Sequence, residues 1–192
     1  MPLPSPQTLD FLLTRRSRPA RTLGLPIPDR AHLITLLTAA VRVPDHGKLT
    51  PWRFIVLHRP ALGRIAALLP ARAAALGTDP EKLPKTVAQY AQSDLAVVVV
   101  AAPKASETIP PIEQTYSAGA VCLTLVNAAL AAGWGANWLS GWPMYDRIIL
   151  HDVLGLTAAE SVAGIVHIGT EITQSTDRPR PDPATLTIWL DA

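Results

Sequence analysis

The sequence RVPDHGKLTPW, residues 42–52, joins a helical hydrophobic pattern to a strand-like run, and the rest of the fold can be worked out from it. Pro44 and Pro51 fix the backbone φ angle at about −65° and remove two amide donors, so this loop is rigid and cannot continue the helix. It also carries Arg42, His46 and Lys48, which make it too polar for a core segment. A rigid cationic loop between two buried elements is a common place for a ligand site. An ordinary helix-to-strand connection would have the same features.

Helical and strand-like patterns alternate on both sides of this loop. The run Leu95–Ala101, LAVVVVA, is apolar throughout, which is typical of a strand covered by helices on both faces. Pro70 is expected to kink or split its helix, and Gly155 to end the helix before it. The predicted helices cover residues 6–14, 30–41, 60–76, 80–92, 112–132 and 143–154, and the predicted strands cover 52–58, 95–101, 136–139, 162–168 and 185–190. This order indicates α+β or α/β, with helices covering a small sheet and a last strand that joins its own sheet or that of a partner.

The composition predicts one domain over residues 1–192 that pairs with a second copy of itself. Hydrophobic residues make up 48% of the chain and charged residues only 17%, whereas about 25% charged residues are typical. The interface of an obligate dimer is apolar, like the core of a domain cut in half, and would account for the low share of charged residues. We therefore predict a homodimer. The 17 Lys and Arg against 15 Asp and Glu give a net charge of +2. So small a charge argues against a nucleic-acid-binding protein.

Several other classes are disfavoured by what the sequence lacks. One cysteine, Cys122, excludes an internal disulfide and a cysteine-based metal cluster, and the five histidines show no metal-ligand spacing. The first residues, MPLPSP, lack the regions of a signal peptide. The long apolar segment 118–139 contains Asn127 and Asn137, which are unusual in a membrane helix of about 20 residues. A cytoplasmic protein with no metal site and no membrane span is expected.

Hydrolase and kinase motifs are also missing. Ser140 lacks the glycine two residues before it that a G-x-S-x-G nucleophile elbow requires. The GWG at 133–135 begins like a dinucleotide fingerprint, but it follows a predicted helix and has Trp138 where the last glycine is needed. These two reaction classes are therefore disfavoured.

Arg15, Arg16 and Ser17 form a candidate phosphate site after the first predicted helix. Two guanidinium groups can bind phosphate oxygens through charge-assisted pairs, and the hydroxyl can reach a third oxygen. The alternative is a solvated basic helix end, whose cations complement the helix dipole.

One ligand would use this cluster, the 42–52 loop and the segment Trp138-Leu139-Ser140 together, namely a phosphorylated planar cofactor. The combination of RRS, the pattern x-P-[SD]-x-x-x-x-x-P-W-x-F starting at Val43, and W-x-S-G resembles the nitroreductase family, in particular its minimal short-chain branch. The resemblance extends from about Leu9 to Trp189. It implies an α+β fold with a small, mostly antiparallel central sheet flanked by helices. It also implies an intertwined homodimer with a C-terminal extension and FMN bound in the interface.

The resemblance also implies the residues that bind FMN. Arg15, Arg16 and Ser17 of one subunit would hold the phosphate and ribityl end, and Arg42 and His46 would reach the same flavin from the other subunit. Trp138, Leu139 and Ser140 would line the isoalloxazine. Because relatives often have Arg in place of Leu139, only a main-chain contact is implied there. Whether Arg178 or Arg180 adds a phosphate contact, and whether the Lys48 side chain reaches the flavin, stays open.

The function implied by this resemblance is an NAD(P)H-dependent flavoprotein that passes hydride through FMN to a nitroaromatic, a quinone or a similar small acceptor. Since the cofactor supplies the chemistry, no catalytic side chain is predicted. Two alternatives stay open. One is a flavin enzyme of other chemistry on the same scaffold, such as a dehydrogenase or a flavin-modifying enzyme. The other is a non-enzymatic protein that binds an anionic ligand. Neither the physiological acceptor nor a choice between NADH and NADPH follows from the sequence.

Overall fold

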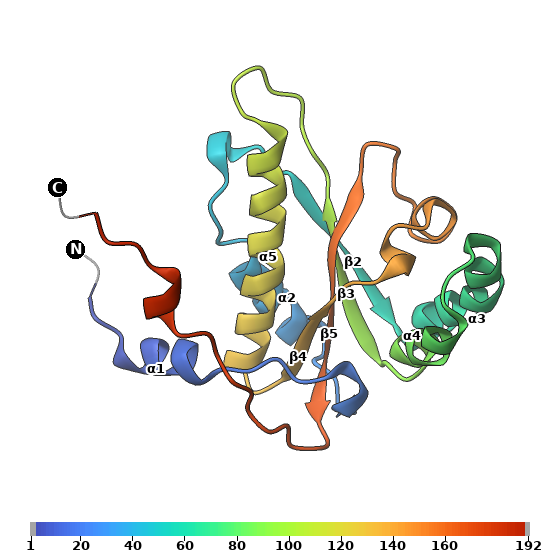
Figure 1. Cartoon of the computed structure of the whole chain (residues 1–192), viewed down its shortest axis with the longest axis horizontal. Coiled ribbons are helices and arrows are strands. Elements are labelled where there is room, and N and C mark those ends of the chain that lie inside the picture. Colours follow the sequence, from blue (N-terminus) through green and yellow to red (C-terminus); the bar gives the residue numbers. More distant parts are fainter. Residues whose placement is uncertain (1–2, 191–192) are drawn as a thin grey trace.

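The computed structural model describes residues 3–190, which form one antiparallel sheet with helices on both faces (Figure 1). Strand β3 lies between β2 and β5, and β5 also pairs with β4 and β1. The strands are β1 (Leu23–Gly24), β2 (Trp52–His58), β3 (Leu95–Ala101), β4 (Gly135–Leu139) and β5 (Ser161–Glu171). The predicted α+β fold with a small antiparallel sheet is therefore confirmed.

Two pairs of helices cover the two faces of the sheet (Figure 1). Helices α2 and α5 lie on one face, and α3 and α4 lie on the other. The helices are α1 (Pro6–Thr14), α2 (Arg30–Ala40), α3 (Arg59–Leu76), α4 (Leu83–Ala91) and α5 (Pro111–Ala131). Short helical turns, used below as landmarks, are η1 (Ala20–Thr22), η2 (His46–Lys48), η4 (Trp142–Met144), η5 (Ile149–Val153) and η6 (Pro183–Leu186).

The apolar run of β3 supplies both cores. Its successive side chains point to opposite faces, as the pleat of a strand requires. Val98 and Val100 pack with the α3 side, and Val97 and Val99 with the α5 side. All seven residues of β3 are buried, which explains why the sequence shows no polar alternation there.

Two predicted helices differ from the structure. Helix α3 is not split at Pro70: it continues through the proline, and Leu69 and Ala73 on either side of it are buried. The helix predicted over 143–154 is instead the turn η4 followed by the π-helical turn η5. The Asp146 carboxylate accepts from the backbone N–H of Ile148 at 3.0 Å and from Arg72 at 2.6 Å, so it starts a new turn at this point.

The strand predicted over 185–190 is not formed within the chain. Residues 183–186 form η6, and residues 187–190 have no regular structure and are exposed. In Figure 1 this segment runs beside α1, away from the sheet. Among residues 3–190, no helix combines the length and the apolar character that a membrane crossing requires.

Candidate functional site

The predicted phosphate cluster and the two C-terminal arginines meet in space. Arg15, Arg16 and Ser17 line a cavity of about 240 Å³ together with Arg178 and Arg180, and Pro19 and Asn137 complete its wall. We call this the arginine cavity. The backbone N–H of Arg18 donates to the carbonyl oxygen of Ala136 at 2.8 Å, which fastens the segment after α1 to β4. Both Arg178 and Arg180 line the cavity, so the structure does not choose between them as a phosphate contact.

The arginine cavity carries an excess of positive charge, because four arginines line it and Asp177, which pairs with Arg180 at 3.1 Å, is the carboxylate beside it. No carboxylate belongs to the described residues that line it. Burial, and then the charges of Arg180 and Arg178, lower the pKa of Arg15 below its ordinary value. Nε of Arg15 and Nη1 of Arg16 are buried without a hydrogen-bond partner among residues 3–190. Because buried donors are normally paired, an anion with several oxygen atoms fits this cavity.

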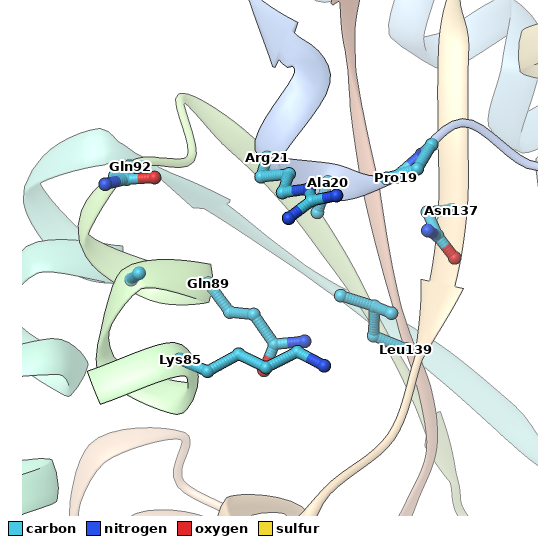
Figure 2. Close-up of a pocket in the computed structure, with 9 residues that line it drawn as sticks. Pro19, Ala20, Arg21, Lys85, Gln89, Gln92, Asn137 and Leu139 are labelled. Atoms are coloured by element: carbon cyan, nitrogen blue, oxygen red, sulfur yellow. The ribbon is translucent and has the colours of Figure 1, made fainter. Parts of the chain in front are cut away.

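A wider cleft of about 510 Å³ opens beside the arginine cavity and shares Pro19 and Asn137 with it. We call it the α4 cleft, because Lys85, Gln89 and Gln92 of α4 and its end line one side. Figure 2 shows Lys85 and Gln89 extending from α4, opposite Asn137 and Leu139 of β4, with Arg21 nearby. Two adjoining cavities therefore lead from an end lined by four arginines to a wider end lined by both polar and apolar residues.

Leu139 and Ser140 lie at this second end, but the Trp138 side chain does not. Leu139 lines the α4 cleft, and Leu139 and Ser140 both line a small adjoining cavity. Trp138 points to the opposite face of β4, where a Cβ atom added to Gly164 would overlap its indole ring. Its side chain is thus on the α5 side, with 39% of the residue exposed. Only the main chain of Trp138 remains near the cleft.

Arg42 and His46 are far from the arginine cavity within one chain. Turn η2 lies beside the N-terminal half of α5, whereas α1 lies near the other end of that helix (Figure 1). His46 Nδ1 lies 2.7 Å from Oε2 of Glu113, which is in the first turn of α5. Because α5 has 21 residues, it separates the two groups by about 30 Å. A single chain does not bring them together.

Sequence reasoning missed Arg21, Lys85, Gln89 and Asn137, which all line the α4 cleft. Asn137 had a usable signal, since it is two residues before Leu139 in a predicted strand and so shares its face. Arg21 belongs to the same arginine-rich segment as Arg15. Nothing in the sequence places α4 opposite β4, so Lys85 and Gln89 had no comparable signal.

A cationic cavity, continued by a cleft between a helix and a strand on this α+β fold, fits a protein that holds a phosphorylated ligand. The Nitroreductase family model matches residues 12–170. The chain belongs to the nitroreductase family, as the resemblance predicted, and is an oxidoreductase.

Individual relatives agree with this assignment. YdjA of Escherichia coli (strain K12), classed with the NAD(P)H nitroreductases, is 31% identical over 176 residues, covering 91% of this chain and 94% of YdjA. A Haemophilus influenzae protein of the same class is 35% identical over 166 residues, covering 84% and 87%. The predicted minimal branch is thus confirmed.

Solved structures show the same fold. A nitroreductase-like family protein from Bacillus cereus has a TM-score of 0.80 at 20% identity, with 100% of both chains covered. The nitroreductase NfnB from sphigopyxis sp. strain HMH, described as FMN- and NADPH-dependent, has a TM-score of 0.73 at 17% identity, covering 95% of this chain and 98% of its own. At these identities the likeness supports the fold alone.

Proposed function

We propose that this chain is an FMN-dependent oxidoreductase that takes electrons from NADH or NADPH and delivers them to an electron-poor acceptor such as a nitroaromatic or a quinone. The observation that carries this proposal is the arginine cavity, in which Nε of Arg15 and Nη1 of Arg16 are buried without an acceptor among residues 3–190. A flavin mononucleotide would supply those acceptors through its phosphate and would extend into the adjoining cleft. When bound, FMN supplies hydride transfer between the nicotinamide and the acceptor.

The chain's own residues would hold this cofactor at two ends. Arg15, Arg16 and Ser17, with Arg178 and Arg180, would bind the phosphate through charge-assisted hydrogen bonds. In the α4 cleft, Asn137 and the main chain of residues 138–140 would face the ring system from β4. Lys85 and Gln89 would offer polar contacts from α4. Arg21 and Lys85 would bring positive charge to this end of the site.

The protein would act as a homodimer, because the 42–52 loop can reach a flavin only from a second copy. Ile112, Tyr116 and Leu123 are exposed at helical spacing on α5, and Tyr116 is 68% exposed. If two α5 helices pack antiparallel about a two-fold axis, the N-terminal end of one lies beside the C-terminal end of the other. Arg42 and His46 would then approach the partner's arginine cavity.

The exposed C-terminal segment fits the same dimer. Ile188, Trp189 and Leu190 are apolar and exposed, and among residues 3–190 they pair with no strand of the sheet. Strand β2 is an edge of that sheet, so its outer hydrogen-bonding groups can accept another strand. The predicted strand over 185–190 would therefore pair with the partner subunit.

The purified protein is expected to be yellow, with FMN as the chromophore that mass spectrometry identifies. Anaerobic NADPH or NADH should bleach the absorption, and a nitroaromatic or a quinone should restore it. A colourless protein that does not respond to added FMN would favour a non-enzymatic anion-binding protein. A flavin that is bleached but passes electrons to neither acceptor would favour an enzyme of other chemistry on this scaffold.

Replacement of Tyr116 by glutamate is expected to convert the dimer into monomers and to weaken FMN binding, because it places charge at the centre of the exposed α5 face. Sedimentation and flavin titration would measure the two effects. Leu76→Glu is the matched control, since Leu76 is also exposed but lies at the end of α3 on the other side of the sheet. Tight FMN binding by a monomeric variant would contradict a site built from two chains.

A further inference from the structure

The 42–52 loop is held in a strained conformation around His46. Lys48, with φ of 54°, and Thr50, with φ of 49°, are the two non-glycine residues with positive φ among residues 3–190. This region is unfavourable, above all for a β-branched residue such as threonine. The Asp45 carboxylate offsets part of the cost by accepting from the backbone N–H groups of Leu49 at 3.1 Å and Thr50 at 2.8 Å. Strain of this kind persists where the surrounding structure fixes it, and it concentrates at functional sites.

Two residues of helix α5 form hydrogen bonds with the loop. Ser117 donates to the carbonyl oxygen of Pro44 at 2.7 Å and accepts from Trp52 Nε1 at 3.1 Å, so it fixes both ends of the loop. One turn earlier on the same face of α5, Glu113 contacts the His46 ring. Ser117 thus sets the backbone of the loop, while Glu113 sets the one imidazole side chain that the loop carries.

The contact between Glu113 and His46 is too exposed to serve mainly as a stabilising pair. The two side chains are 44% and 62% exposed, and surface pairs contribute about 1 kcal/mol or less. Its effect is on the ring itself. A carboxylate only accepts hydrogen bonds, so Nδ1 of His46 carries the proton. Nε2 then faces away from Glu113, and it has no hydrogen-bond partner among the described residues.

We propose that Glu113 is a positioning residue, which fixes the orientation and tautomer of His46 so that Nε2 is presented to the flavin bound in the partner subunit. This inference rests on the proposed function, because it requires a flavin bound between two chains. It adds a residue that acts through His46 and does not itself touch the cofactor. The sequence gives no indication of this role, because Glu113 is distant from the loop along the chain and lies in an ordinary helical pattern.

The positioning can be tested without cofactor. Long-range ¹⁵N NMR of the imidazole rings should show the proton of neutral His46 on Nδ1, and the signals of His46 can be assigned with the His46→Ala variant among the five histidines. In Glu113→Ala this preference should be lost. Glu107→Ala is the matched control. It removes the same negative charge, but Glu107 is exposed in the loop before α5. An unchanged His46 tautomer in Glu113→Ala would overturn the proposal.

The effect on FMN can be tested by a double-mutant cycle. Loss of one hydrogen bond predicts that His46→Ala and Glu113→Ala each raise the Kd for FMN roughly three- to tenfold. Since Glu113 acts through His46, the double variant should bind like His46→Ala alone. Independent, additive effects would overturn the proposal, as would a wild-type Kd in Glu113→Ala. A wild-type chain that binds no FMN at all would instead refute the proposed function.

Discussion

The variant carrying both Arg15→Ala and Arg16→Ala is expected to bind FMN at least about 100-fold more weakly than the wild type. Each charge-assisted hydrogen bond contributes about 1.5–3 kcal/mol, and the variant loses at least two donors, Arg15 Nε and Arg16 Nη1, that are unpaired within the described part of the chain. Fluorescence titration of the flavin-free protein would measure the change. Without ligand, this variant should be no less stable than the wild type, because burial, and then repulsion from Arg180 and Arg178, disfavour the charged form of Arg15 and lower its pKa.

A control with the same loss of charge separates local binding from overall electrostatics. Arg30→Ala combined with Arg64→Ala removes two exposed arginines from α2 and α3, outside both the arginine cavity and the α4 cleft. Its FMN affinity should stay close to that of the wild type. Equal weakening in both double variants would mean that the phosphate is not held in the arginine cavity.

Acid is expected to destabilise the folded protein by about 3 kcal/mol between pH 6.5 and pH 4 through His167 alone. Burial lowers the pKa of His167 from 6.5 to about 4, and Nδ1 of the ring lies 2.8 Å from Oγ of Ser93. In this range the unfolded chain binds a proton that the folded chain excludes, so the free energy of unfolding falls as the pH falls. A difference of about 2.5 pKa units, at 1.36 kcal/mol each, gives the expected size.

Denaturant unfolding at a series of pH values, with constant protein and excess FMN, would measure this slope. His167→Gln should flatten it between pH 6.5 and 4. Glu160→Gln should leave the slope nearly unchanged above about pH 5, because Arg53 lowers the pKa of Glu160 from 4.5 to about 2 and its contribution is lost mainly between these two values. A wild-type slope in His167→Gln would place the origin of the acid sensitivity elsewhere.

The sequence predicted best those elements whose pattern reflects their own burial. The apolar β3 run and the long α5 pattern ending before Gly133 are both confirmed. The helix over 143–154 was wrong, because Arg72 from a different helix binds Asp146 and stabilises a new turn. A partner so distant in the chain leaves no periodic signal. The homodimer stays a prediction, since it depends on which surface of the chain meets a second copy and not on the packing within one chain.

In the candidate site, too, residues of a local motif could be predicted, whereas residues brought in by tertiary packing could not. Arg15, Arg16 and Ser17 form a local motif, and the structure gathers them in one cavity. Trp138 was assigned to a cofactor wall as part of a motif, but strand alternation turns its side chain toward α5 and turns Asn137 and Leu139 toward α4. Lys85 and Gln89 depend on the packing of α4 opposite β4, which no local pattern encodes.

Helix α4 buries only Tyr90 among its nine residues, although it forms one whole side of the cleft. Its cleft-facing positions are therefore free of the packing demands that constrain β3 and α5. Substitutions at Lys85 or Gln89 can alter the shape and charge of that side while the sheet and the arginine cavity stay intact. This end of the proposed site can therefore change in evolution while the residues that line the arginine cavity are retained.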